Sequence, residues 1–144
     1  MSDDHAQSDI GRLRALPKAE VHVHLEGCFE PIVLEHWATQ AGVPMPRPRE
    51  RLLQFEGLTD FLGFLDWACG LASTREHLAE LSYGFSRRLA ASGAGYADVL
   101  VSPIHWSAWH GRLRDMIDAI DAGLTAAEQD GLPPVGLCIS LSRT

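Results

Sequence analysis

Two histidines, His22 and His24, stand near the end of a β-branched run over residues 19–25, with the sequence Ala-Glu-Val-His-Val-His-Leu. In an extended strand, side chains two positions apart leave the same face. Two imidazoles held a few ångströms apart can each donate a nitrogen to one Zn²⁺ ion. The spacing therefore predicts a metal-binding pair. A tripeptide this short is also compatible with two half-buried histidines that only make hydrogen bonds.

Other residues are weaker candidates for the same chemistry. His105 follows a second apolar run and could reach the same site, but a loop histidine is the favoured interpretation. Cys28 could supply a soft ligand, although the favoured interpretation is that its small side chain only fills space. Glu20 is expected to point away from the histidine pair, and His36 and His77 are expected on helices. Catalytic zinc takes about three protein ligands and a water, so the pair alone does not complete a site.

The elements that must position these residues alternate along the chain. Residues 1–8 are expected to form a frayed tail, and residues 10–16 a short amphipathic helix that Pro17 ends. Strands are predicted over residues 19–25, 96–101 and 135–141. Helices are predicted over residues 31–40, 58–72 and 109–127, with another that starts after Thr74 and ends at Gly93 or Gly95. This order is typical of an α/β fold with parallel strands.

Three strands are few for a parallel sheet, which is normally covered on both faces. We therefore expect an N-terminal tail and short helix over residues 1–16, followed by an incomplete α/β domain over residues 17–144.

Composition excludes several classes of protein. The 144 residues hold 12 Lys and Arg against 19 Asp and Glu, for a net charge of -7, which disfavours nucleic acid and anionic membranes as partners. No segment approaches the roughly 18 apolar residues of a membrane span, and the polar N-terminus does not resemble a signal peptide. The 3 cysteines are widely spaced and odd in number, which predicts no disulfide framework and a cytoplasmic location.

Residues 16–27, Leu-Pro-Lys-Ala-Glu-Val-His-Val-His-Leu-Glu-Gly, closely resemble the opening motif of the adenosine deaminase family. That family belongs to the metal-dependent amidohydrolases and is built on a (β/α)₈ barrel. Weaker similarity extends over residues 58–66 and 95–103, and Arg143 falls where the family often has an arginine. The resemblance implies the first three strands of such a barrel, truncated after the third.

The resemblance also implies a function. His22 and His24 would be two zinc ligands, and His24 and Glu26 would contact a small purine substrate. Zinc-bound water would attack C6 of adenosine, adenine or a modified adenosine, and ammonia would leave. Phe61, Leu62 and Leu65 could form an apolar wall over the purine, although a helical core stripe is the favoured interpretation. The general acid/base and the other ligands would lie beyond Thr144, in the missing half of the barrel, and these 144 residues alone would be inactive.

Two alternatives stay open. The chain could be a catalytically inert remnant or an interaction module that binds Zn²⁺ weakly. It could also come from another amidohydrolase that opens with His-x-His and hydrolyses amides, lactones or phosphoesters. The Pro17-Lys18 lead-in and the Leu25-Glu26-Gly27 continuation disfavour this second alternative, because those relatives generally lack them.

Overall fold

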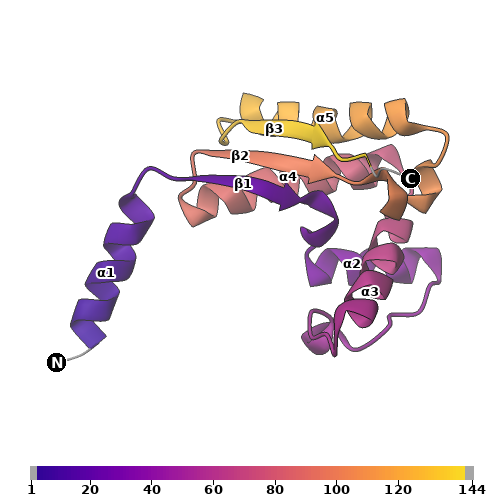
Figure 1. Ribbon diagram of the computed structural model, residues 1–144, viewed down its shortest axis with the longest axis horizontal. Helices are drawn as coiled ribbons and strands as arrows, with labels where there is room; N and C mark the ends of the chain where they lie inside the picture. The colour runs from indigo at the N-terminus through magenta and orange to yellow at the C-terminus, as the bar shows by residue number, and fades with distance from the viewer. Residues whose placement is uncertain (1–2, 142–144) are drawn as a thin grey trace.

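The computed structural model describes residues 3–141, with side chains from residue 9 onward. Its strands are β1 (Ala19–His24), β2 (Tyr96–Val101) and β3 (Val135–Ile139), and they form one parallel sheet in the order β1-β2-β3. Its helices are α1 (Asp3–Ala15), α2 (Pro31–Ala41), α3 (Leu58–Leu71), α4 (Arg75–Ser92) and α5 (Leu113–Gln129). The alternating α/β order predicted from the sequence is confirmed (Figure 1).

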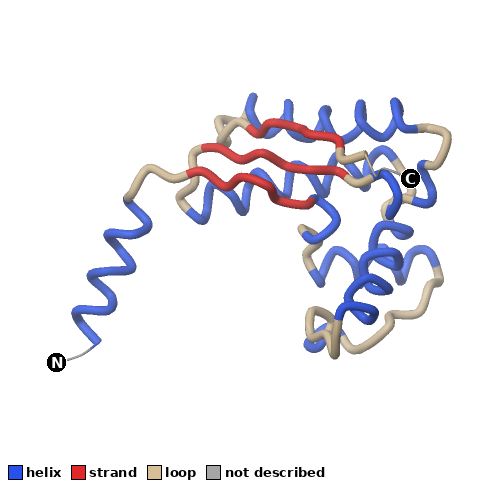
Figure 2. Tube along the Cα trace, in the orientation of Figure 1, coloured by secondary structure: helices blue, strands red, loops and turns tan. Residues whose placement is uncertain are grey.

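The sheet buries one of its faces. Ala97, Val99 and Val101 of β2 are fully buried, whereas Asp98 and Leu100, which alternate with them, remain partly exposed. Helices α4 and α5 run alongside the strands, while α1 extends away from the start of β1 (Figure 2). Helices α2 and α3 lie near the carboxyl end of the strands, where parallel α/β folds place ligands. The elements at that end are therefore the ones that can build a site.

Helix ends follow local chemistry. Pro31 occupies the first turn of α2, and Gly42 ends that helix with a φ of 66°, which glycine adopts without strain. The Thr74 hydroxyl oxygen accepts a hydrogen bond from the backbone N–H of His77 at 3.2 Å and caps α4. Gly93 ends α4, again in the left-handed region. No helix of the described chain is long and apolar enough to cross a bilayer.

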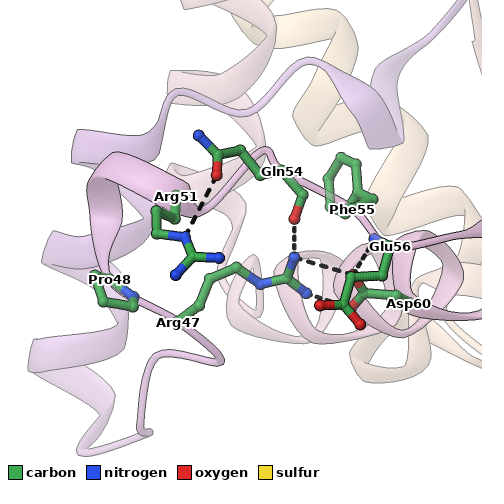
Figure 3. A pocket seen from close by; sticks show the side chains of 7 residues that line it. All are labelled: Arg47, Pro48, Arg51, Gln54, Phe55, Glu56 and Asp60. Carbon is green, nitrogen blue, oxygen red and sulfur yellow. Dashed lines mark hydrogen bonds and ion pairs between the residues drawn. The ribbon is translucent and has the colours of Figure 1, made fainter.

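The loop between α2 and α3 is anchored to the first turn of α3. The guanidinium of Arg47 donates to both carboxylate oxygens of Asp60 and to the backbone carbonyl of Gln54 (Figure 3). The backbone N–H of Glu56 donates to Asp60 Oδ2 at 3.0 Å. These hydrogen bonds hold the pKa of Asp60 below its ordinary value, and the bond from Arg47 contributes most. An open hollow of about 490 Å³ beside them is lined by the same loop.

Three elements, α1, α5 and β3, differ from the prediction by two residues or more at an end. Helix α1 begins at Asp3, so the frayed tail expected over residues 1–8 is wrong for its described part. Helix α5 begins at Leu113 instead of residue 109, because Ser107–Trp109 form a 3₁₀ turn and Gly111 has a φ of 79°. Strand β3 ends at Ile139, two residues early. The strand over residues 96–101 and the cap at Thr74 are confirmed.

Candidate functional site

The histidine pair lies at the end of β1, where the strand carries a bulge. From Glu20 to Val23 strand β1 advances three residues while β2 advances two. His22 lies within this bulge with a φ of 64°, a left-handed conformation uncommon for a residue other than glycine. The ring centroids of His22 and His24 lie 5.4 Å apart. The two imidazoles are adjacent, as their spacing predicts, but a bulge and not a regular strand positions them.

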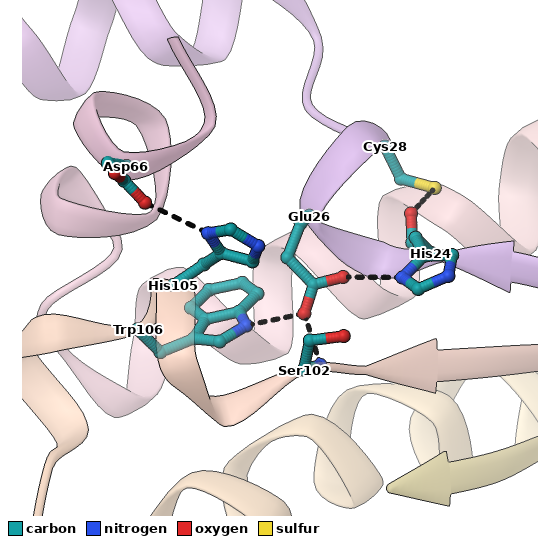
Figure 4. Close-up of polar contacts among 7 residues, drawn as sticks. All are labelled: His24, Glu26, Cys28, Asp66, Ser102, His105 and Trp106. Carbon is teal, nitrogen blue, oxygen red and sulfur yellow. Dashed lines mark hydrogen bonds and ion pairs between the residues drawn. The ribbon is translucent and has the colours of Figure 1, made fainter. Parts of the chain in front are cut away.

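A buried carboxylate follows the pair. Glu26 lies in the 3₁₀ turn Leu25–Gly27 and is 1% exposed. Its Oε1 accepts hydrogen bonds from the backbone N–H of Ser102 and, at 2.8 Å, from Nε1–H of Trp106 (Figure 4). Its Oε2 has no hydrogen-bond partner among the described residues and lies 3.5 Å from Nδ1 of His24. Buried polar atoms are nearly always paired, so Oε2 is an acceptor left for a ligand or for His24.

A cavity of about 290 Å³ opens beside His24 and Glu26. Helix α3 supplies its apolar wall, and the loop after β2 supplies much of its polar side. Its lining includes His24, Glu26, Phe61, Leu65, Ser102 and His105. An apolar wall with a few convergent polar groups is typical of a small-molecule site. The cavity thus joins the ends of β1 and β2 to α3.

His105 is held at the edge of this cavity by a carboxylate. Its Nδ1 lies 2.9 Å from Oδ1 of Asp66, which α3 supplies (Figure 4). An ionised carboxylate only accepts, so Nδ1–H donates and Nε2 is the remaining ring nitrogen. The loop histidine considered in the sequence therefore shares a cavity with His24.

The thiol of Cys28 contacts the end of β1. Burial raises the pKa of its thiol to about 11, with the Arg88 charge opposing that shift. The Sγ–H group donates to the backbone carbonyl of His24 at 3.2 Å. Because the thiolate is the form that binds metals, a thiol protonated at neutral pH supports the packing role favoured from the sequence.

The histidine pair fits two positions of a zinc site. Two imidazoles bound to one Zn²⁺ at about 2.0–2.1 Å in tetrahedral geometry have ring centroids about 5 Å apart. The observed 5.4 Å agrees with this spacing. The described residues contain no group of three or more His, Cys, Asp and Glu side chains arranged to hold a metal. The pair therefore fits part of a catalytic zinc site.

The remaining candidates from the sequence lie elsewhere. Glu20 lines a different hollow, against Phe85 and Leu89 of α4, and is not in the lining of the cavity. His36 is exposed on α2, and the ring of His77 stacks on Trp37 with centroids 4.3 Å apart. Leu62 is 39% exposed and is not part of the cavity wall that Phe61 and Leu65 form. Arg143 lies outside the described residues.

Sequence reasoning missed two partners of the site. Trp106 and Asp66 were not candidates, although one contacts Glu26 and the other His105. Loops that follow parallel strands meet at one edge of the sheet, so the loop after β2 could have been placed near Glu26. The sequence carried no signal for which side chain of that loop turns inward.

Comparison with known proteins gives the lineage. An adenosine deaminase of Enterococcus faecalis is 29% identical over 126 residues, 83% of this chain and 37% of that protein. An adenine deaminase of Emericella nidulans is 33% identical over 103 residues, 63% of this chain and 28% of that protein. The crystal structure of an amidohydrolase from Burkholderia ambifaria with bound Zn aligns with a TM-score of 0.78 and 22% identity, over 95% of this chain and 38% of the other. The chain thus spans between 28% and 38% of the length of these proteins.

The fold comparison agrees with the sheet. The three parallel strands, in the order β1-β2-β3 with helices between them, align with the Burkholderia ambifaria amidohydrolase. They are three strands of a (β/α)₈ barrel, which confirms the predicted fold class. The family described as "Adenosine deaminase" matches residues 17–139, which include the histidine pair, the buried carboxylate and all three strands. This chain belongs to the adenosine deaminase family.

Proposed function

We propose that the chain is part of a zinc-dependent deaminase that hydrolyses the 6-amino group of adenosine, adenine or a related aminopurine. The observation that carries the proposal is the placement of His22 and His24, with ring centroids 5.4 Å apart, beside the buried carboxylate of Glu26. The names of two relatives, an adenosine deaminase and an adenine deaminase, support a purine as substrate.

His22 and His24 would hold the zinc ion. When bound, zinc would lower the pKa of a coordinated water to about 7 and so supply a hydroxide nucleophile at neutral pH. The bulge gives the two histidines their angle, and Nδ1 of His24 faces Glu26, which leaves its Nε2 to point elsewhere. Further ligands and the general acid/base would come from residues outside these 144.

The cavity beside the pair would take the purine. Phe61 and Leu65 offer an apolar surface to a flat ring, and Glu26 Oε2 offers an acceptor to an N–H or O–H group of the substrate. His24, which borders the same cavity, would contact the substrate from the metal side.

We place the protein in the cytoplasm, because its three cysteines are all free.

The experiment measures metal content and amine release together on the intact protein that carries this chain. We expect about one zinc per chain and release of the 6-amino group of at least one purine, as ammonia from adenine or adenosine or as methylamine from N6-methyladenosine. His22→Ala and His24→Ala should each lose the metal and the activity. His36→Ala, which removes an exposed imidazole from α2, is the matched control and should keep both. Full activity in a variant without bound metal would refute the mechanism.

A second candidate is a weakly zinc-binding module without catalysis. It is favoured for these 144 residues alone because the described part of the chain contains no cluster of three metal-binding side chains. The chain expressed alone should then release neither ammonia from adenine or adenosine nor methylamine from N6-methyladenosine. Release of either amine by the isolated chain would rule out this candidate and would show that these residues suffice.

A further inference from the structure

We infer that Trp106 is a positioning residue for the metal ligand His24 and acts through Glu26. The inference rests on the proposed function, because it assumes that His24 binds zinc. It concerns three side chains: His24 ends β1, Glu26 lies in the turn that follows β1, and Trp106 lies in the loop after β2 (Figure 4).

The contacts give the two oxygens of Glu26 different surroundings. Oε1 is held from two directions, by the backbone N–H of Ser102 and by the indole N–H of Trp106. Oε2 receives no hydrogen bond among the described residues and faces Nδ1 of His24 at 3.5 Å. Two donors on one oxygen fix the plane of a carboxylate, and the direction of the second oxygen follows from that plane.

Trp106 is suited to hold this arrangement. Its side chain is 0% exposed, and its ring lies 6.0 Å from that of Phe29, centroid to centroid. A buried indole has a single donor and cannot turn without leaving its pocket. Glu26 is itself 1% exposed, so water does not replace the indole N–H if that donor is lost. The position of Oε2 therefore depends on Trp106.

The orientation of Glu26 affects metal binding through the tautomer of His24. A carboxylate that accepts Nδ1–H leaves Nε2 unprotonated, which is the form that binds zinc. At 3.5 Å the contact is long for a hydrogen bond, and a small rotation of Glu26 decides whether it forms. Without the indole N–H, Glu26 would no longer be held in the orientation in which Oε2 faces Nδ1, so Oε2 would turn away from His24 and the metal site should weaken.

The test measures the affinity of the intact protein for Zn²⁺ alone, by competition with a chelating dye. Trp106→Phe removes the indole N–H and keeps an aromatic ring. Trp109→Phe is the matched control: Trp109 is also buried, at 2% exposed, and its Nε1–H donates to the Ala72 carbonyl at 2.7 Å, away from Glu26. We expect Glu26→Gln to lower the affinity about 10- to 100-fold and Trp106→Phe about 3- to 10-fold, with Trp109→Phe within about twofold of wild type.

A double-mutant cycle separates positioning from general destabilisation. In the Glu26→Gln background, Trp106→Phe should cause no further loss of Zn²⁺ affinity, because its effect passes through the carboxylate. A merely structural role would lower the affinity equally in both backgrounds, and equally for the two tryptophans. Either of those results overturns the inference.

The outcomes also separate this inference from the proposed function. A wild-type protein that binds no Zn²⁺ refutes the proposed function, whatever the tryptophan variants do. A wild-type protein that binds Zn²⁺ with an affinity unchanged by Glu26→Gln refutes the inference and leaves the function standing. The Glu26→Gln measurement does not need the Trp106 variant, so an unchanged affinity refutes the inference even if Trp106→Phe fails to fold.

Discussion

Helices α4 and α5 meet at a glycine, and one methyl group there should separate them. A Cβ on Gly123 would lie 2.3 Å from the backbone oxygen of Ala79, 2.8 Å from its Cα and 2.2 Å from Oγ of Ser82. Non-bonded atoms pack at about 3.5–4.0 Å. The Ser82 hydroxyl, which donates to the Ile120 carbonyl at 2.9 Å across the two helices, could rotate away, but the backbone of α4 cannot.

We expect Gly123→Ala to lower the free energy of unfolding by about 2–3 kcal/mol. Overpacking costs about 1–3 kcal/mol. The upper end applies because the added Cβ would collide with backbone atoms of α4, which cannot rotate away as a side chain can. Loss of the Ser82–Ile120 hydrogen bond adds about 1 kcal/mol. The higher helix propensity of alanine offsets about 1 kcal/mol of this destabilisation. Urea unfolding of the intact protein, followed by circular dichroism, measures the difference.

Gly63→Ala is the control for this prediction. Gly63 lies inside α3 with no atom within 4 Å of an added Cβ, so this variant should gain up to about 1 kcal/mol from propensity alone. If Gly123→Ala is as stable as Gly63→Ala, the close approach of α4 and α5 does not exist and the reasoning is refuted.

Three shorter predictions test other parts of the fold. Asp60→Asn should make the free energy of unfolding depend less on pH in the acid range. The pKa of Asp60 is lowered from 3.8 in the folded protein, so the carboxylate stabilises the fold fully above its unfolded-state pKa and loses this effect as the pH falls through its lower folded-state pKa. Urea unfolding midpoints of variant and wild type between pH 6 and 3 check this. Equal slopes for variant and wild type would contradict it. Thr74→Ala should cost about 1 kcal/mol of unfolding free energy through loss of the α4 cap, whereas Thr74→Ser should cost much less, and thermal unfolding of both decides. Burial raises the pKa of the Cys69 thiol, so iodoacetamide at pH 8 should alkylate Cys69 in urea but not in the native protein. Fast labelling of the native thiol would show that the buried face of α3 becomes exposed to solvent.

The sequence predicted the elements where local chemistry decides them. Strand β2 follows Gly95 and ends just before Pro103, with alternating apolar residues between, so its limits are set within eight residues of chain. The cap at Thr74 is equally local. The start of α5 was predicted at residue 109 and was wrong, because the observed turn depends on the left-handed Gly111 and on a buried Trp109. The burial of Trp109 is a tertiary effect and has no periodic signature.

The same division holds at the site. Spacing alone placed the rings of His22 and His24 together, but a period of two assumes a regular strand, and the inserted residue of β1 carries no pattern that a single sequence displays. The partners of Glu26 lie 76 and 80 residues further along the chain. Topology brings their loops together, and only packing determines that Trp106 turns inward while Ile104 of the same loop stays 65% exposed.

Local rules are broken at one place in the described chain, and that place bears on the choice between the proposals. The positive φ of His22 and the unpaired Oε2 of Glu26 both occur within a few residues at the end of β1. Each costs stability, of the order of 1–3 kcal/mol, and neither improves packing. A module that only packs against a partner has no physical need for either feature. A zinc site needs both imidazoles at a fixed angle, and a purine site needs a free buried acceptor. For the intact protein that carries this chain, the coincidence of the two features beside one cavity therefore favours the deaminase over the inert module.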